Sequence, residues 1–374
     1  MGEIITEYKK TVDSDCTLPI LTSSKTEGVI LQEEHFGRKQ QHDITGYNIL
    51  PRNYCTYRNR SDGVDFTFNI NKCCDKGIIS KFYPVFSGKN SDVFFLSLVL
   101  NNSDEVVREI AYTCTGTGQK VLSFLDLQKM KVRVPSFDEQ KEIATYFDSL
   151  DHLITLHQQK LTLLTKLKKA MLEKMFPKKG SVIPEFRFNG FANAWEQRKL
   201  GELAFFNPKE KLPDVFEYVD LESVVGIEML SHRTEEKATA PSRAQRLAHT
   251  GDLFYQTVRP YQKNNYLFEK SEKHYVFSTG YAQLRPLVDG YFLLSLVQNG
   301  QFVKTVLDNC TGTNYPAINA NDLAEIDVFY PKDEHEQHQI GEYFRHLDHL
   351  ITLHQRKLDM LKKLKSACLS EMFI

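Results

Sequence analysis

Two long stretches of the chain place mostly apolar residues at alternating intervals of four and three positions, which is the pattern of a coiled-coil seam. Within residues 138–176 the seam positions are Ile143, Phe147, Leu150, Ile154, His157, Leu161 and Leu164. Within residues 335–373 they are Ile340, Phe344, Leu347, Ile351, His354, Leu358 and Leu361. The pattern predicts two long helices whose matching seams pack on each other.

The second stretch repeats the first 197 positions later, with 24 of 39 residues identical. Each copy begins with a sequence that resembles a helix capping box, Ser136-x-x-Glu139 and Asp333-x-x-Glu336. We therefore expect helices over 135–177 and 331–374. At about 1.5 Å per residue, each would be a rod of roughly 58 Å, which is typical of a spacer.

Each predicted helix follows a longer region of mixed character, 1–134 before the first and 178–330 before the second. The ends of these regions repeat, as in Cys114-Thr115-Gly116-Thr117 and Cys310-Thr311-Gly312-Thr313, whereas 25–90 and 225–290 share little. A simple dimerisation coiled coil would explain the heptads alone. A repeat of domain plus helix instead indicates two domains of one fold that carry different loops.

Short apolar or alternating runs closed by Gly or Pro, such as 77–86 and 252–258, predict β-strands inside both domains. Helices are expected at 92–102 and 291–300, with shorter ones near 123–130 and 320–325. The expected fold class is α+β.

Composition limits the possible functions. A hydrophobic content of 41% and a charged content of 25% are typical of a globular protein. No apolar run is long enough to span a membrane, and residues 1–10 do not resemble a signal peptide, so we expect a cytoplasmic protein. The seven cysteines lack metal-site or disulfide spacing, and we expect reduced thiols.

The chain resembles the specificity subunit of type I restriction-modification systems. The resemblance rests on the order of domains and helices, on the DxLDxLIxLHQxKL motif of the helices, and on Phe191-x-x-x-Trp195-Glu196-Gln197-Arg198-Lys199-Leu200-Gly201-Glu202. It implies two target-recognition domains held by an antiparallel helix pair, each reading half of a split DNA sequence. It also implies two docked adenine methyltransferase subunits and a translocating nuclease. S-adenosylmethionine, ATP and magnesium are then expected on those partners, and no cofactor on this chain.

One departure from the family pattern concerns the first domain. Met1-Gly2-Glu3-Ile4 aligns with Leu200-Gly201-Glu202-Leu203, so the first domain is expected to lack an opening segment of about twenty residues. Either its edge is incomplete, or the segment after the first helix serves in its place.

Candidate DNA contacts lie in the repeated Thr-Gly turns and in two basic clusters. Hydroxyls and free backbone amides can grip phosphate, although a tight structural turn is the alternative for Thr115-Gly116-Thr117 and Thr311-Gly312-Thr313. Arginine and amide side chains can position the protein on phosphates or specify bases, although any one of them could lie in a solvated loop. The cluster residues are Arg52, Arg58, Arg60, Arg259, Tyr261, Lys263 and Asn264.

Other functions remain open from the sequence. The net charge of -1 is low for an autonomous DNA binder, so either basic residues cluster or partners supply positive charge. No nucleotide-binding loop, HExxH or GxSxG motif is present, which favours a non-catalytic subunit without a metal. His157 and His354 are expected to be polar register positions in the coiled coil. A stand-alone bipartite repressor or architectural protein, or a self-contained nuclease or methyltransferase, are the alternatives.

Overall fold

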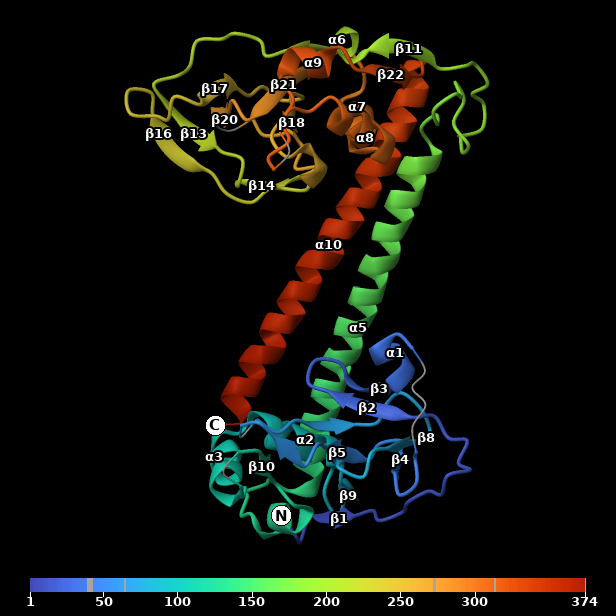
Figure 1. The fold of residues 1–374 in the computed structure, drawn as a ribbon. Helices are drawn as coiled ribbons and strands as arrows, with labels where there is room; N and C mark the ends of the chain where they lie inside the picture. The colour runs from blue at the N-terminus through green and yellow to red at the C-terminus, as the bar shows by residue number, and fades with distance from the viewer. Residues whose placement is uncertain (39–42, 64, 117, 272–273, 313, 374) are drawn as a thin grey trace. The chain divides into compact units, whose positions relative to one another are not determined.

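The computed structural model describes the chain except residues 39–42, 64, 117, 272–273, 313 and 374 (Figure 1). The chain forms two compact units. Unit 1 consists of Met1–His157 with Lys357–Ile374, and unit 2 of Gln158–Arg356. The two long helices, α5 (Phe137–Lys174) and α10 (Glu334–Met372), confirm the predicted helical repeat, and each contributes residues to both units.

Both units contain a four-stranded antiparallel sheet with the same strand order. In unit 1 the order is β1 (Ile5–Glu7), β9 (Val85–Gly88), β5 (Cys55–Tyr57), β7 (Phe68–Ile70). In unit 2 it is β12 (Ala204–Phe206), β21 (Tyr281–Pro286), β18 (Leu253–Gln256), β19 (Tyr266–Leu267). The registers correspond as well, since Cys55 opposes Phe86 in one sheet and Leu253 opposes Leu284 in the other. The common scaffold inferred from the repeat is therefore present.

Each sheet is accompanied by three helices in the same order along the chain. They are α2 (Val93–Asn102), α3 (Asp104–Thr113) and α4 (Phe124–Lys129) in unit 1, and α7 (Gly290–Gln298), α8 (Gly300–Asp308) and α9 (Ala320–Ala324) in unit 2. The expected helices are confirmed. A separate second helix was not predicted, because Ser103 and Asn299 each end one helix and cap the next within a single residue.

Outside the shared sheet the units differ, as the divergent sequences predict. Unit 1 has paired strands β2 (Leu21–Ser24) with β3 (Gly28–Leu31), β4 (Asn48–Pro51) with β8 (Lys76–Ile79), and β6 (Arg60–Ser61) with β10 (Lys120–Val121), besides α1 (Gln32–Phe36). Unit 2 has a second sheet in the order β16 (Arg233–Glu236), β13 (Val215–Val219), β20 (Tyr275–Ser278), β17 (Ala244–Leu247). It also contains β14 (Val224–Val225) with β15 (Glu228–Met229), the 3-10 turn η1 (Pro260–Gln262), α6 (Leu200–Leu203), and β11 (Glu196–Lys199) with β22 (Asp327–Tyr330).

Within each unit, a part of α5 packs antiparallel to a part of α10. In unit 2, Lys168 contacts Asp348 and the Phe176 ring lies 6.2 Å from that of Phe344. In unit 1, Asp151 contacts Lys365 and the Phe147 ring lies 6.1 Å from that of Phe373. In both cases later residues of one helix meet earlier residues of the other, so the pair is antiparallel, as expected.

The cores join the helix seams to the sheets. In unit 1, Phe147, Leu150 and Leu361 are buried with Tyr57 and Phe86. In unit 2, Leu164, Ile340, Phe344 and Leu347 are buried with Tyr255, Leu284 and Phe292. Among the described residues, no helix is apolar over enough of its length to cross a bilayer.

Candidate DNA-recognition site

The repeated Thr-Gly segment forms the same tight turn in both units. In unit 1, Thr115 and Val121 exchange two backbone hydrogen bonds of 2.9 Å. In unit 2, Thr311 and Ala317 exchange bonds of 2.9 and 3.0 Å. The backbone of both threonines therefore forms a structural turn. Both side chains are exposed, and the Thr311 hydroxyl also donates to the Ala317 carbonyl at 3.5 Å. Thr117 and Thr313 lie outside the described residues.

The glycine of the turn is required by backbone geometry, most of all in unit 1. Gly116 has a φ of +100°, and a Cβ there would lie 2.3 Å from the Gln119 carbonyl oxygen. Gly312 has a φ of +84°, with the nearest atom, the Tyr315 carbonyl oxygen, at 3.1 Å. Residues with a side chain rarely adopt such φ values. The turn is therefore tighter in unit 1.

An arginine lies beside each turn, supported by an aromatic ring. In unit 1, Arg60 pairs with Val121 in the β6–β10 ladder, and its guanidinium lies 4.7 Å from the centre of the Phe82 ring. In unit 2, Arg259 donates its backbone N–H to the Pro316 carbonyl at 2.8 Å, and its guanidinium lies 4.5 Å from the Tyr315 ring. Of the predicted basic residues, these two are brought to the Thr-Gly turns by strand or backbone pairing.

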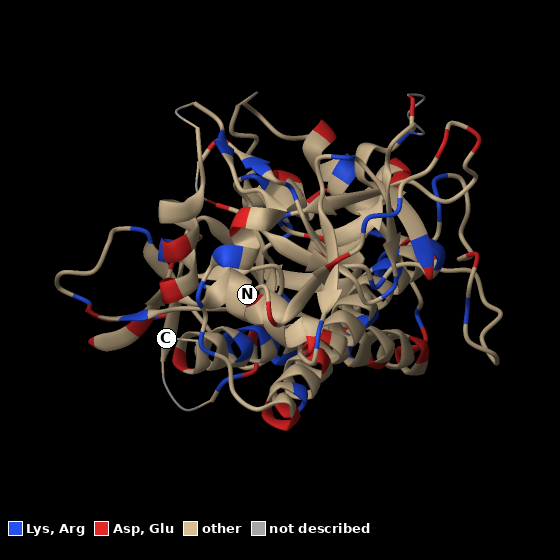
Figure 2. Ribbon diagram, turned by 90° about the horizontal axis from the view of Figure 1, so that it is seen from below, with Lys and Arg blue, Asp and Glu red and all other residues tan. Residues whose placement is uncertain are grey.

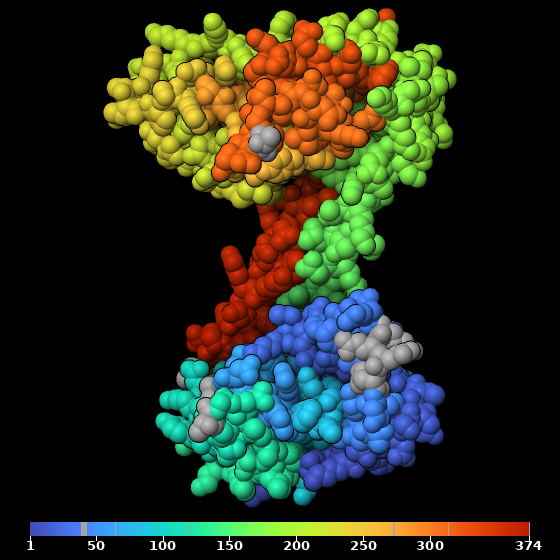
Figure 3. Space-filling model, in the orientation of Figure 1, coloured from blue at the N-terminus to red at the C-terminus, as the bar shows by residue number. Residues whose placement is uncertain are grey.

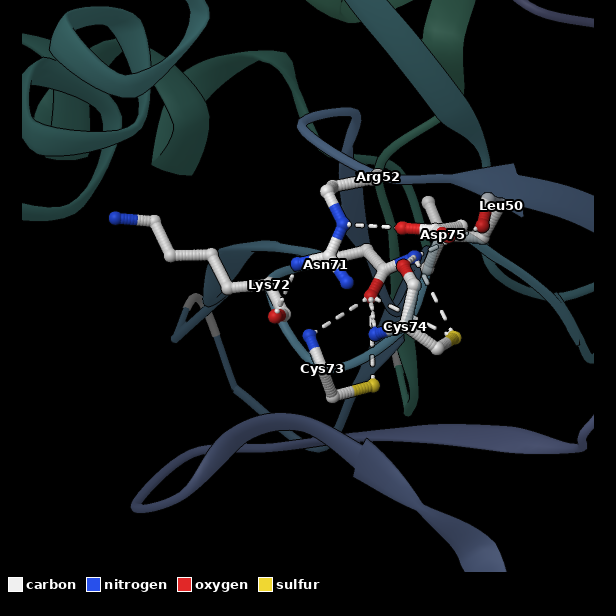
Figure 4. A network of polar contacts seen from close by, with 7 residues as sticks. All are labelled: Leu50, Arg52, Asn71, Lys72, Cys73, Cys74 and Asp75. Atoms are coloured by element: carbon white, nitrogen blue, oxygen red, sulfur yellow. Dashed lines mark hydrogen bonds and ion pairs between the residues drawn. The ribbon is translucent and has the colours of Figure 1, made fainter.

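Arg52 belongs to a different network, around the turn that follows β7 (Figure 4). Its Nε–H donates to Asp75 and its Nη1–H to the Lys72 carbonyl, both at 2.8 Å. The fully buried Asn71 holds this turn, since its amide donates to the Leu50 carbonyl and its oxygen accepts from the backbone N–H of Cys73. Arg52 is therefore fixed by an acidic partner. Arg58 is exposed on the segment after β5.

The predicted cluster in unit 2 divides into residues that hold the loop and residues that face solvent. Lys263 donates to the Gln298 carbonyl at 2.8 Å, and burial lowers its pKa. The Asn264 side-chain oxygen accepts from the Gly226 N–H at 2.8 Å. Tyr261, by contrast, is half exposed. Lys263 and Asn264 thus stabilise the loop, and Tyr261 and Arg259 are better placed to meet a ligand.

Two ion pairs related by the 197-residue repeat lock the helix segments. Lys365 lies 2.5 Å from Asp151 in unit 1, and Lys168 contacts Asp348 in unit 2. Asp348 also accepts from the Tyr291 hydroxyl at 3.1 Å.

All fourteen predicted seam residues are buried or half-buried, including His157 and His354. In the described part of the chain, no group of three or more metal-ligating side chains is gathered.

The comparison with known families decides what this arrangement belongs to. The model of the type I restriction modification DNA specificity domain matches residues 8–166 and 234–363, which together make up most of the chain. The chain belongs to this family. Family members supply DNA specificity to a multi-subunit enzyme and are not themselves catalytic.

Individual relatives agree with this assignment. The type I restriction enzyme MjaVIII specificity subunit of Methanocaldococcus jannaschii is 23% identical over 325 residues, covering 78% of this chain and 72% of that protein. The crystal structure of the type I restriction-modification S subunit from M. genitalium matches with a TM-score of 0.63 and 13% identity. That match covers all of this chain and 94% of the other, and it supports the fold.

The specificity protein also carries a second apolar stripe on its long helices, outside the seam. Its positions repeat between the helices at a distance of 197 residues. Unit 1 contains Tyr146, Leu153 and Leu156 of α5 with Met360 and Leu364 of α10, all exposed; unit 2 contains Tyr343, Leu350 and Leu353 of α10 with Leu163 and Leu167 of α5. In unit 2, Tyr343 and Leu350 are half-buried. Each unit therefore presents one version of the same surface.

Two features of the candidate site are not predicted from the sequence. Tyr315 is 63% exposed and stacked on Arg259. It lies inside the turn that Thr311 and Ala317 close, and this place in the repeated turn was the available signal. The sequence predicts Glu336 as part of a capping box at the start of the second long helix. Its carboxylate does not serve that start alone as a capping-box acceptor, because it is 1% exposed and accepts two hydrogen bonds from Arg187, at 2.6 and 2.7 Å.

Proposed function

We propose that this specificity protein recognises a bipartite DNA sequence, with each unit recognising one half. The proposal rests on one observation: the two units share a scaffold, but the strands inserted into that scaffold differ between them. The same four-stranded sheet and the same Thr-Gly turn occur in both units, while the strands inserted between the scaffold strands differ. A constant frame with variable insertions is what two readers of different half-sites require.

Within each unit we assign two kinds of contact. The exposed Thr115 and Thr311 hydroxyls, with Arg60 and Arg259 beside them, suit contacts with phosphate, which position a protein without specifying sequence. Specificity then comes from the divergent strands and loops, whose side chains differ between the units. Tyr261 and Tyr315 are exposed aromatic groups near Arg259 that can pack against the DNA.

The charge distribution supports action together with partners. Lys and Arg are interspersed with Asp and Glu along the helices and loops (Figure 2), and the net charge is -1. A DNA complex gains much of its affinity from phosphate neutralisation, so partner subunits must add positive charge. We propose that these partners are two adenine methyltransferase subunits, joined by nuclease/translocase subunits for cleavage. S-adenosylmethionine, ATP and magnesium are then bound by those partners.

The apolar stripe of each unit is the surface that we assign to a methyltransferase subunit. Exposed leucines and methionine on a helix that already buries a full seam have no role in the seam itself. Contiguous exposed apolar side chains often mark protein interfaces. Because the stripe is repeated, it provides two related docking surfaces and supports a stoichiometry of two.

The direct test is co-expression with the methyltransferase subunit, followed by sequencing of methylated adenines. We expect methylation within one split sequence with an unread gap. Replacing 178–330 with the corresponding region of another family member should change one half-site and leave the other. Deleting one heptad from both α5 and α10 should change the gap and leave both half-sites. Tight, sequence-specific binding by the isolated chain would instead favour a stand-alone repressor.

The phosphate role is tested on the assembled methyltransferase. Arg60→Ala and Arg259→Ala should each weaken binding to cognate and unrelated DNA by a similar factor, and reduce the slope of log affinity against log salt by about 1. Arg356→Ala provides the control, because Arg356 is an exposed arginine of α10 that lies 3.5 Å from Glu228. If either variant changed the recognised bases, that arginine would be a base-reading residue.

A further inference from the structure

The loop of residues 257–265 joins two strands of the shared sheet in unit 2, β18 and β19. It contains the 3-10 turn η1. The equivalent segment of unit 1, residues 58–67, joins β5 to β7 and contains the short strand β6 instead. The loop therefore belongs to the divergent part of unit 2, to which the proposed function assigns base specificity.

Distant segments fix the backbone of this loop on both sides of η1. Arg259 and Lys263 have φ values of +55° and +56°, which residues with a side chain adopt uncommonly. The Arg259 N–H donates to the Pro316 carbonyl, and the Lys263 side chain donates to the Gln298 carbonyl, both at 2.8 Å. Such conformations persist where the surroundings hold them, and they cluster at ligand-binding sites. The shape of the loop is therefore set before a ligand binds.

A buried glutamine holds the side chain of Gln262, the last residue of η1. The Gln256 Nε2 donates to the Val258 carbonyl at 2.7 Å and to the Gln262 Oε1 at 2.9 Å. A backbone carbonyl can only accept a hydrogen bond, so the Gln256 atom that faces Val258 must be the amide nitrogen. The Gln256 oxygen has no hydrogen-bond partner among the described residues, so the Val258 carbonyl decides which way this amide faces.

The orientation of the Gln262 amide follows from that of Gln256. The Gln256 nitrogen is a donor only, so the Gln262 atom that faces it must be the oxygen. Gln256 is 3% exposed, whereas Gln262 is exposed. Within the described part of the chain, no residue accepts a hydrogen bond from the Gln262 Nε2. Gln262 thus directs its acceptor oxygen to a buried partner and presents two N–H donors on an exposed side chain.

An amide that offers only donors discriminates among the bases of DNA. Guanine presents two neighbouring acceptors in the major groove, N7 and O6, whereas adenine presents the acceptor N7 beside the donor N6. Glutamine usually reads adenine, because its oxygen accepts from N6 while its nitrogen donates to N7. The Gln262 oxygen is directed to Gln256, so this adenine pairing is disfavoured. The edge of guanine fits the donors that remain.

On the basis of the proposed function, on which this inference rests, we propose that Gln262 is a specificity-determining residue of unit 2. Its Nε2 donates to the acceptor edge of a guanine in the half-site that unit 2 recognises. Gln256 is a positioning residue, which acts by holding the Gln262 oxygen. Arg259, assigned above to phosphate, begins the same turn and fixes the position of the loop on the DNA backbone.

The test uses the assembled methyltransferase and the sequence in which it methylates adenine. Gln262→Glu keeps an oxygen facing Gln256 but replaces the outer amide group with a second oxygen. That oxygen repels the guanine acceptors and can accept from cytosine N4. We expect methylation of the original site to fall at least about tenfold, with cytosine preferred at that one position and the half-site of unit 1 unchanged. Gln197→Glu, the same change at an exposed position of β11, is the matched control and should leave the sequence unchanged.

Two further variants separate base reading from positioning. Gln262→Ala should relax selection at the same guanine without changing the slope of log affinity against log salt, because no phosphate contact is lost. Gln256→Met should free the Gln262 amide to turn, so that adenine is accepted beside guanine at this position. A purely structural role of Gln256 would instead weaken binding to every sequence without adding adenine.

Three results would overturn the proposal. One is a recognised sequence that Gln262→Glu leaves unchanged. Another is a relaxed position that is not a guanine. The third is an equal loss of affinity for all sequences with a smaller salt slope, since Gln262 would then contact phosphate. If the unaltered complex methylates no split sequence, the proposed function fails and this inference fails with it. If the unaltered complex does so and Gln262→Glu has no effect, only this inference fails.

Discussion

Units 1 and 2 are built on one sheet and on nearly the same helix sequence, yet they treat equivalent residues differently. Glu336 is sealed beneath Arg187 and Trp195, whereas Glu139 is exposed. The Lys168–Asp348 pair is 19% and 7% exposed, whereas Lys365–Asp151 is 28% and 36% exposed. The comparison teaches that a repeated sequence fixes which groups meet within the helix pair, while the neighbouring segment decides how deeply they are buried.

The largest expected effect comes from the sealed carboxylate. Arg187→Ala leaves Glu336 buried without its main partner and should lower the free energy of unfolding by about 3–5 kcal/mol. Glu139→Ala in unit 1 should change it by no more than about 0.5 kcal/mol, because an exposed residue is removed. Urea denaturation of both variants measures the difference. Equal effects would mean that the ion pair does not hold the segment in place.

The next effect distinguishes the two Thr-Gly turns. Gly116→Ala should destabilise unit 1 by about 2–3 kcal/mol, because a positive φ and a backbone clash act together. Gly312→Ala should cost about 1–2 kcal/mol, since its nearest atom is farther away. Thermal unfolding, monitored in each unit by hydrogen exchange, would measure the two costs separately. A larger cost for Gly312→Ala would contradict the view that the unit 1 turn is the tighter one.

The two repeat-related ion pairs should differ in the same direction as their burial. A double-mutant cycle with Lys168→Met and Asp348→Asn should give a coupling of about 2 kcal/mol, because this pair is largely removed from water. The cycle with Lys365→Met and Asp151→Asn should give less than about 1 kcal/mol. The Tyr291→Phe variant serves as a control. It removes the hydroxyl that donates to Asp348, as in unit 1, where Phe94 stands at the equivalent position. Equal couplings would show that burial is not the deciding factor.

The smallest effect concerns the cap of α4. The Ser123 hydroxyl holds the pKa of Asp126 below its usual value, and Lys129 adds to this lowering. The resulting stabilisation is present above the ordinary pKa of 3.8 and is lost as pH falls through the lowered value. Ser123→Ala should therefore raise the pKa of Asp126 toward its ordinary value, as seen by carbon-13 NMR, and cost about 1 kcal/mol through loss of the cap. Asn319→Ala at the equivalent cap of α9 should cost a similar amount.

Much of the fold could be predicted from the sequence, because the patterns that indicate its helices and strands are local. The heptad positions around Phe147 and Phe344 predicted both long helices, and the run at 92–102 predicted α2. The site was accessible only in part. Arg60 and Arg259 do lie beside the Thr-Gly turns, but their roles in DNA binding stay predictions, as do the proposed domain boundaries.

The segment after α8 contributes to the orange surface in Figure 3. The exposure of Tyr315 in that segment could not be derived from the sequence in the same way. The stacking of Tyr315 on Arg259 depends on how the turn closes against Val258, through the bridge to Ala317. Lys263 and Asn264 were grouped with Arg259 because they are neighbours in sequence. Their side chains instead bond to Gln298 and Gly226, which are distant in sequence.

The sequence by itself determined the repeat, the two helices with their seams, the α+β class and the family. These follow from periodicity and motif, in which each residue is informative together with its neighbours along the chain. Only the tertiary structure decided that Glu336 is sealed and Glu139 exposed, although both stand in the same helical motif. Burial depends on which remote segment packs over a residue, and for Glu336 that segment comes from about 140 to 150 positions away, at Trp195 and Arg187.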